Sequence, residues 1–339
     1  IGIGCGLIRM QNGHYMTGDG NHHRMVEVDM MGNTIHNWDM LERGYTMHHA
    51  ISQDKQGNIL ATVSKTSAKI ANGKDVRIND FIIRMDPEKG EILQEWDLVH
   101  MLDSARYGMT DYNLTADPYA QNASNWAHNN GIVEWGNDYL ATARYQGIFK
   151  FNKAGGIEWI ISPHGYWRDR YLKLLLNPLH ANGTPITDPD VIAGTKNCDD
   201  FEWPWGCHTA VPLPNGHIFY FNNGYGRNFK LDFTDRKNVY TCGIEYEVDE
   251  VNRTVRQVWQ YGKERGTAYF TPARSGVQYL EQTGNRLICP GMSNVLSNGN
   301  RGARVTEVDP ETQEIVFELE LEDAIYQRVY RMSLYPDNQ

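Results

Sequence analysis

The sequence predicts an all-β protein, a six-bladed β-propeller with its functional site at one mouth of the central channel. Three observations predict this fold. Strand-like runs recur in groups of four, tight turns such as Asn-Gly separate them, and the junction between the third and fourth run repeats. That junction reads Val-Asp-Met-Met-Gly-Asn-Thr-Ile at 28–35 and Val-Asp-Pro-Glu-Thr-Gln-Glu-Ile at 308–315. Four short antiparallel strands repeated about a ring are typical of a propeller.

Five units carry this pattern completely. The strands that we expect are, unit by unit, one ending at Asn12-Gly13 with 14–17, 24–29 and 34–39; 49–53, 58–63, 81–85 and 91–97; 132–134, 139–143, 147–151 and 157–161; 208–213, 218–221, 243–248 and 255–260; 277–280, 286–290, 304–308 and 314–321. The run 328–334 looks like the first strand of a sixth unit. We therefore expect one propeller domain over 1–339, with blades at about 1–40, 46–98, 127–161, 207–260, 275–321 and, in part, 328–339.

Tryptophan follows the repeated junction in four units, at Trp38, Trp96, Trp159 and Trp259. We expect these indoles to pack between blades and not to hold a cofactor. Two insertions, 99–126 and 162–206, break the period, and each precedes a histidine considered below. Long loops on a rigid scaffold often carry function, so we expect both insertions to wall one mouth of the channel.

Composition narrows the class of partner. The formal net charge is −10, and no cluster of Lys and Arg stands out, which argues against nucleic acids and acidic membrane surfaces as partners. No apolar run is long enough for a membrane span, so none is expected. The chain starts Ile1-Gly-Ile-Gly without a signal peptide, which we interpret as the internal start of a processed or trimmed protein.

Three histidines share one position in the repeat, each eight residues before the glycine of a turn: His49, His128 and His208. Because the first strand of each blade lines the channel, an equal position means an equal height, and we expect these imidazoles to meet at one mouth. His48 beside His49 leaves a second alignment open. Asn130 lies two residues after His128 in the same strand and should face the same side, and Arg144 ends the next strand.

This set of side chains indicates the chemistry of the site. Three imidazoles can bind a metal ion, but no carboxylate shares their position and the expected neighbour is a cation, Arg144. Histidine, arginine and asparagine together suit an oxyanion such as sulfate or phosphate, and a neutral imidazole can act as a nucleophile. Aromatic residues near the mouth can grip a ring, among them Trp126, Trp205 and Tyr330. The close spacing of Cys198 and Cys207 predicts a local disulfide, with free thiols as the alternative.

Four segments together resemble the bacterial arylsulfate sulfotransferases: Met47-His48-His49, Asn125-Trp-Ala-His128-Asn-Asn130, Ala143-Arg144 and Gly206-Cys207-His208-Thr-Ala. The resemblance covers about 5–335. It implies a six-bladed propeller, in the periplasm or cell envelope, that moves a sulfuryl group from a phenolic sulfate ester to another phenol by a ping-pong route. It implies no nucleotide sulfate donor and no metal cofactor.

The resemblance also implies roles for single residues. His208 matches the nucleophile that becomes sulfohistidine, while His49, His128, Asn130 and Arg144 match groups that bind the sulfuryl oxygens or handle the phenol proton. A threonine of the next blade falls on Thr271 or Ser275, and the sequence does not decide between them. Some members carry a disulfide just before the nucleophile, as Cys198 and Cys207 would, and that bond would need a disulfide-forming oxidase. Whether the chain forms a homo-oligomer stays open.

Two other classes of function fit the same pattern. One is a metal-dependent propeller lyase or lactonase that uses the histidine ring, and it predicts sensitivity to chelators. The other is a propeller that only binds ligands or partners through its aromatic loops, and it predicts neither turnover nor a covalent adduct.

Overall fold

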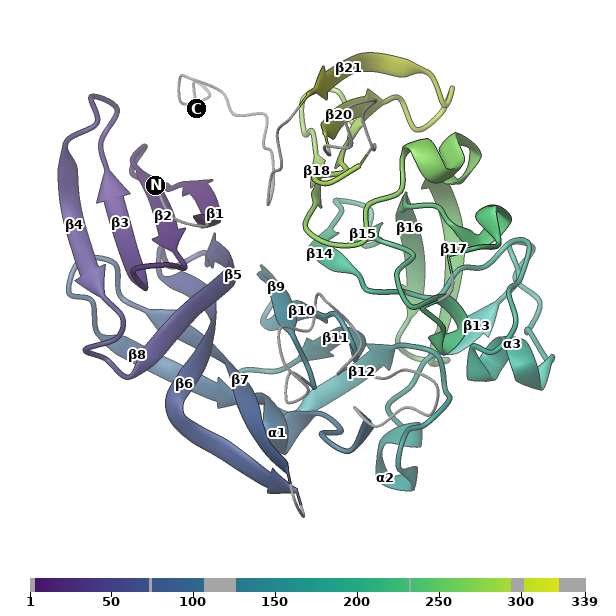
Figure 1. Ribbon diagram of the computed structural model, residues 1–339, viewed down its shortest axis with the longest axis horizontal. Helices are drawn as coiled ribbons and strands as arrows, with labels where there is room; N and C mark the ends of the chain where they lie inside the picture. The colour runs from purple at the N-terminus through teal and green to yellow at the C-terminus, as the bar shows by residue number, and fades with distance from the viewer. Residues whose placement is uncertain (1–3, 73–74, 107–125, 232, 294–301, 323–339) are drawn as a thin grey trace.

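The computed structural model describes residues 4–72, 75–106, 126–231, 233–293 and 302–322. Within these ranges the chain folds into five sheets arranged around a common centre, as Figure 1 shows. This arrangement confirms the all-β propeller. The described residues form five blades where six were predicted, and the predicted partial blade at 328–339 lies outside the described residues.

The sheets take their strands in chain order. The strands are β1 (Gly4–Arg9), β2 (Tyr15–Asp19), β3 (Arg24–Val28) and β4 (Thr34–Asp39); β5 (Tyr45–Gln53), β6 (Ile59–Asn72), β7 (Asp75–Met85) and β8 (Ile92–Asp97); β9 (Asn129–Trp135), β10 (Asp138–Ala143), β11 (Gly147–Phe151) and β12 (Ile157–Ile161); β14 (His208–Pro212), β15 (Ile218–Asn222), β16 (Cys242–Asp249) and β17 (Thr254–Tyr261); β18 (Gly276–Tyr279), β19 (Arg286–Cys289), β20 (Ala303–Val308) and β21 (Ile315–Leu321). A further strand, β13 (Asn177–Leu179), joins the fourth sheet beside β17.

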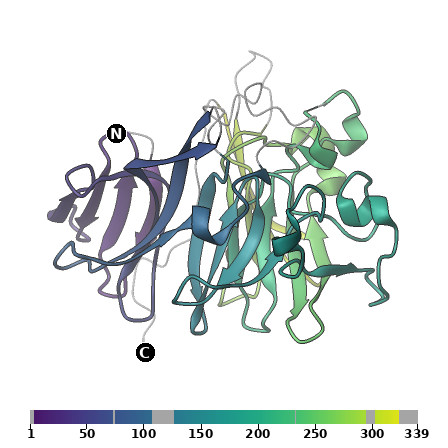
Figure 2. The ribbon, with the colours of Figure 1, turned by 90° about the horizontal axis from the view of Figure 1, so that it is seen from below.

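Neighbouring strands in each blade are antiparallel, and the first strand of each lies innermost (Figure 1). Seen from the side, the strands run roughly along the axis of the ring (Figure 2). The inner ends of β1, β5, β9, β14 and β18 therefore gather around the channel. A residue's position along its inner strand then sets its height in the channel, as the sequence pattern predicts.

The four repeated tryptophans fasten each blade to the next. Each indole Nε1 donates a hydrogen bond to the third-to-fourth strand junction of the following blade: Trp38 to the Pro87 carbonyl, Trp96 to that of Lys153, Trp159 to the Glu250 carboxylate and Trp259 to the Pro310 carbonyl. The bonds are 2.8 to 3.1 Å long. The conserved spacing within the repeat thus produces a recurring contact between blades, and the predicted packing role is confirmed.

The inner strands are irregular near one end. The register of β5 with β6 shifts between Met47 and Ile51, that of β14 with β15 shifts between His208 and Ala210, and that of β9 with β10 shifts next to Asn129. His128 and Thr209 hold positive φ angles of 53° and 44°. A bulge re-aims the side chains around it, so strict alternation of faces does not hold at this end.

The insertion at 162–206 forms secondary structure of its own and pairs with two blades. It contains the helices α2 (Asp169–Leu172) and α3 (Pro189–Ala193) and the strand β13, which pairs in parallel with β17. Ile160 of β12 donates to the Leu174 carbonyl at 2.8 Å and accepts from the Leu176 amide at 2.9 Å. The insertion therefore runs along the outer edges of two neighbouring blades before it returns to the centre at Trp205. Most of the insertion at 99–126 lies outside the described residues.

The remaining helices are short. They are α1 (Leu98–Met101) and three turns of 3₁₀ helix, η2 (Arg227–Phe229), η3 (Arg236–Asn238) and η4 (Lys263–Ala268). None of the helices in the described ranges is both long and apolar enough to cross a membrane.

Candidate functional site

The three predicted imidazoles meet at the irregular end of the inner strands. His49 lies on β5, His128 directly precedes β9, and His208 begins β14. The Nε2 atoms of His49 and His128 are 3.0 Å apart, and the ring centroids of His49 and His208 are 6.3 Å apart. Residues about 80 positions apart in sequence thus share one site, because each holds the same place in its blade.

The side chains of the site are largely buried and lie beside two arginines. His128 and His208 are only 7% and 5% exposed. Burial lowers the pKa of His49 well below its ordinary value, and the neighbouring imidazoles and Arg144 lower it further. The pKa of His128 is lowered well below its ordinary value by burial and then by His49 and Arg144. Both rings are therefore neutral at physiological pH, and each has one ring nitrogen with a free lone pair.

Asn223 fixes the tautomer of His208. The Asn223 Nδ2 donates to two backbone carbonyls, those of Thr271 at 2.9 Å and Arg274 at 3.2 Å, so its Oδ1 must be the atom that faces the imidazole. That oxygen lies 2.6 Å from His208 Nδ1, and the Gly206 carbonyl lies 3.2 Å from the same nitrogen. Two acceptors at Nδ1 require a proton there, which leaves the lone pair on Nε2.

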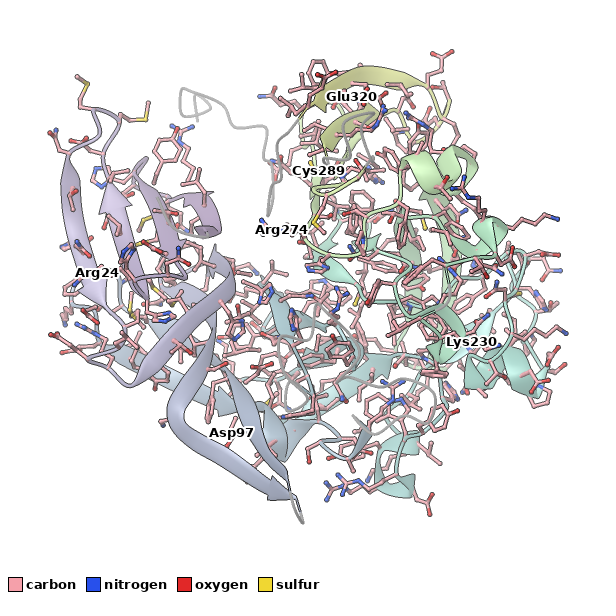
Figure 3. All side chains as sticks on the ribbon, viewed as in Figure 1. Arg24, Asp97, Lys230, Arg274, Cys289 and Glu320 are labelled. Carbon is pink, nitrogen blue, oxygen red and sulfur yellow. The ribbon has the colours of Figure 1, made fainter. Side chains whose placement is uncertain are left out.

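Two arginines lie close to the imidazoles. Arg144 directly follows β10, is 3% exposed, and donates from Nη2 to the Pro272 carbonyl at 2.8 Å. Its guanidinium stacks 4.5 Å from the centre of the Tyr225 ring. Arg274 also contributes to the low pKa of His49, and Figure 3 shows it at the inner side of the fifth blade. Two guanidinium groups beside the imidazoles give this end of the channel a local positive charge.

Asn130 lies on β9, after His128 and the positive φ of that histidine. The Asn130 Oδ1 accepts from Thr142 Oγ1 at 2.7 Å, and its Nδ2 donates to the Cys207 carbonyl at 2.8 Å. Asn130 thereby connects the third blade to the backbone just before His208.

Thr271 and Ser275 form one hydrogen-bonded loop. The Thr271 hydroxyl donates to the Ala273 carbonyl at 2.9 Å and accepts from the Met292 amide, while the Ser275 hydroxyl accepts from the Gly291 amide at 2.9 Å. Both are buried. The loop contacts the site through the Thr271 carbonyl, which binds Asn223.

The predicted aromatic residues fall in different surroundings. Trp126 is 1% exposed and packs in the core between the second and third blades. Trp205 lines a small pocket that opens to solvent, together with Arg144, Tyr225 and Phe229. Of the two indoles, Trp205 therefore has the position to contact a ligand beside Arg144. Tyr330 lies outside the described residues.

The predicted disulfide is absent. Cys198 and Cys207 are both free thiols. The Cys198 sulfur donates to Asp200 Oδ1 at 3.2 Å, whereas Cys207 is fully buried in the core, where burial raises its pKa to about 12. Both residues border the same apolar cluster, but Asp200 accepts from one thiol and the core encloses the other. The prediction was wrong for this structure.

Sequence reasoning missed three groups at the site. Asn223 directly follows β15, as Arg144 directly follows β10, so comparing the ends of the second strands would have found it. His48 was considered only as an alternative to His49, yet both side chains contribute, because their Nδ1 atoms lie 3.0 Å apart. Asp80 reaches the site from β7 and has no counterpart in the repeat pattern that we used.

The comparisons with known proteins agree with this geometry. The family model described as Arylsulfotransferase (ASST) matches residues 3–331. The chain is 28% identical over 365 residues to the arylsulfate sulfotransferase of Escherichia coli O6:H1, which covers 98% of this chain and 60% of that protein. The corresponding protein of Lelliottia amnigena is also 28% identical, over 366 residues with the same coverage. The chain thus spans about 60% of the length of the curated relatives it matches.

A solved structure supports the fold alone. A Bacteroides caccae protein of unknown function is 11% identical, with a TM-score of 0.52 over 94% of this chain and 81% of that chain.

Proposed function

The chain belongs to the arylsulfotransferase family, and from that premise we propose that it transfers a sulfuryl group from a phenolic sulfate ester to an acceptor phenol. The transfer is ping-pong, with the group held on His208 between donor and acceptor. The observation that carries the proposal is the contact between His208 Nδ1 and Asn223 Oδ1 at 2.6 Å, because it places the nucleophilic lone pair on Nε2.

The first half-reaction follows from this tautomer. The Nε2 lone pair of His208 attacks sulfur, the bond from sulfur to the phenolic oxygen breaks, and the phenolate leaves with the electron pair. The imidazole keeps its Nδ1 proton, so the sulfated ring is a zwitterion that Asn223 and the Gly206 carbonyl stabilise. The acceptor phenol reverses these steps.

The side chains around His208 bind the sulfuryl oxygens and transfer the phenol proton. Arg144, and with it His49, His128 and Asn130, binds the sulfuryl oxygens, whose charge is best stabilised by preorganised donors in a dry site. A histidine, His49 or His128, gives its proton to the leaving phenolate and takes one from the incoming phenol. Thr271 or Ser275 supports the loop that holds Asn223, and Trp205 contacts the aromatic ring of the substrate.

Further features belong to the same proposal. The enzyme needs no nucleotide sulfate donor and no metal, since a divalent ion beside Arg144 would be repelled. The propeller is six-bladed, and the protein works in the periplasm or cell envelope.

The test is incubation with 4-nitrophenyl sulfate alone, followed by intact and peptide mass measurement. We expect a gain of one SO₃ group on the peptide that contains His208, and its loss when phenol is added. Turnover should be unaffected by a chelator. A modified peptide elsewhere, or turnover without any adduct, would contradict the assignment of His208.

A further inference from the structure

A line of hydrogen-bonding rings connects the site to a carboxylate. From the centre outward, His128 Nε2 contacts His49 Nε2 at 3.0 Å, and His49 Nδ1 contacts His48 Nδ1 at 3.0 Å. His48 Nε2 then lies 3.7 Å from Asp80 Oδ1. Each of the two inner contacts joins ring nitrogens directly, so the three imidazoles form one continuous chain that ends at Asp80.

The outer end of this chain is enclosed. The His48 Nε2 is buried, and the Asp80 carboxylate lies 3.7 Å from it. Asp80 is 4% exposed. Its oxygens accept from Ser64 Oγ at 3.1 Å and from the Asn129 amide at 2.9 Å. A buried carboxylate with only neutral donors is able to stabilise a positive charge on a neighbouring ring.

We propose that Asp80, His48, His49 and His128 form a proton relay that supplies the proton to the leaving phenolate and recovers it from the acceptor phenol. This inference rests on the proposed sulfuryl transfer and extends it to two residues, Asp80 and His48, that act through the other rings. The relay gives one proton to the leaving phenolate in the first half-reaction and takes one back from the acceptor phenol in the second.

The protons balance over the cycle. The relay acts in its protonated form, in which His48 carries one extra proton as an imidazolium beside the Asp80 carboxylate. Burial keeps the pKa of His48 below its ordinary value, so the population of this form rises as pH falls. When the phenolate leaves, His48 passes its Nδ1 proton to His49, His49 passes its Nε2 proton to His128, and His128 gives a proton to the phenolate. Three neutral rings and a carboxylate remain beside the sulfated His208. The acceptor phenol returns its proton along the same path as its oxygen attacks sulfur.

The electrostatics of the chain fit this direction of transfer. Burial lowers the pKa of His48 below its ordinary value, and the Asp80 carboxylate offsets only part of that effect. At His49 and His128 burial and the neighbouring cations act together to lower the pKa. The extra proton is therefore more stable at the Asp80 end than in the centre, where it would repel Arg144.

A purely structural role for Asp80 makes a different prediction. Its bond to the Asn129 amide fastens β7 to the start of β9, and losing that bond would disturb the site as a whole. Such damage would slow all donors alike. A proton relay matters most for phenolates that are poor leaving groups, because a stable phenolate leaves without help.

The experiment compares two donors in Asp80→Asn and His48→Gln. The asparagine retains an oxygen that can accept from Asn129 or Ser64 but cannot stabilise the imidazolium. We expect turnover of phenyl sulfate to fall by about 10²-fold or more in both variants, and that of 4-nitrophenyl sulfate by less than about tenfold. The control is Asp54→Asn, a buried carboxylate at the opposite end of the same blade that pairs with Arg84, and it should treat the two donors alike.

Each outcome decides the question. Equal losses on both donors, or no loss on either, in the folded variants would overturn the relay. If Asp80→Asn does not fold, His48→Gln alone decides by the same ratio of donors. A wild-type protein that turns over neither donor would instead overturn the proposed sulfuryl transfer, so the two failures are distinct.

Discussion

The two ends of the inner strands use histidine in opposite ways. At the turn end, His14 Nδ1 lies 2.6 Å from a Glu27 oxygen in the first blade, and His217 Nδ1 lies 2.6 Å from a Glu245 oxygen in the fourth. Each of these histidines follows an Asn-Gly turn. At the other end, His49, His128 and His208 meet one another and Arg144. The fourth blade therefore carries a histidine paired with a carboxylate, His217, at one end and His208, among imidazoles and Arg144, at the other.

The difference between the two ends is electrostatic. Burial raises the pKa of Glu27, but hydrogen bonds from His36, His14 and Asn12 outweigh it and hold that pKa below its usual value. These hydrogen bonds hold each imidazole against a buried carboxylate. At the mouth, burial and neighbouring cations lower the pKa of His49 and His128, so these rings stay neutral and able to exchange protons. The charges around each histidine, and not the residue type, thus distinguish the two ends of the strands.

The largest effect expected from this contrast is at His208. His208→Ala should abolish sulfuryl transfer, with a loss beyond the roughly 10²–10³-fold that a missing oxyanion donor causes, because it removes the proposed nucleophile. The matched change at the turn end, His217→Gln, should leave turnover within about twofold and cost about 1 kcal/mol in unfolding free energy. Initial rates with 4-nitrophenyl sulfate and phenol measure the first, and urea unfolding the second. Comparable activity in the two variants would contradict the different roles given to the two ends of the strands.

Arg144→Gln should rank second, with turnover reduced by roughly 10²–10³-fold. The glutamine removes the positive charge that faces the sulfuryl oxygens but retains a hydrogen-bond donor for the Pro272 carbonyl. Steady-state kinetics and thermal unfolding on the same sample give the measurement. A variant that loses stability in proportion to its activity would indicate that Arg144 acts mainly through its backbone contact.

Asn223→Ala should have a smaller effect, roughly 10–10²-fold on turnover, by analogy with other partners that orient a histidine. Without the Oδ1 acceptor the proton of His208 is able to occupy either ring nitrogen, and part of the population loses the Nε2 lone pair. The ¹⁵N chemical shifts of the imidazole report the tautomer directly. An unchanged tautomer in the variant would show that the Gly206 carbonyl alone suffices.

The two ends should also differ in the pH range where they affect stability. His49 and His128 have a folded pKa well below the ordinary 6.5, so the unfolded state binds more protons below that value and the unfolding free energy falls as pH falls through it. Glu27 has a folded pKa below 4.5, so its contribution is present above 4.5 and lost only at lower pH. His128→Gln should reduce the pH dependence of the unfolding free energy below pH 6.5, and Glu27→Gln should reduce it below pH 4.5. Urea unfolding across pH tests this, and a single shared range would contradict it.

The smallest effect concerns the cysteines. Cys198→Ser should change the unfolding free energy by no more than about 0.5 kcal/mol, because the hydroxyl is able to donate to Asp200 as the thiol does. Unfolding with and without a reducing agent is the measurement. A large loss of stability on reduction would show that the thiols pair after all.

The sequence was sufficient where the repeat itself carries the information. The position of His49, His128 and His208 relative to the turns was enough to bring them together, because propeller blades convert position in the repeat into height. The partners of side chains near the bulges were not predictable, among them the Cys207 carbonyl that accepts from Asn130, because strict alternation does not hold there. The cysteine prediction failed because short spacing does not determine which way two side chains point.

The long insertion has a consequence for association of the protein with other chains. Exposed strand edges offer unpaired backbone groups to which a further strand can add. Here β13 occupies the edge of β17, and the segment around Leu175 occupies that of β12. These two blades therefore offer no free outer edge at β12 or β17 for pairing with another chain. Among the described strands, β4, β8 and β21 are the outer strands of the other three blades. A deletion that shortened the insertion would expose fresh edges and should make the protein precipitate more readily.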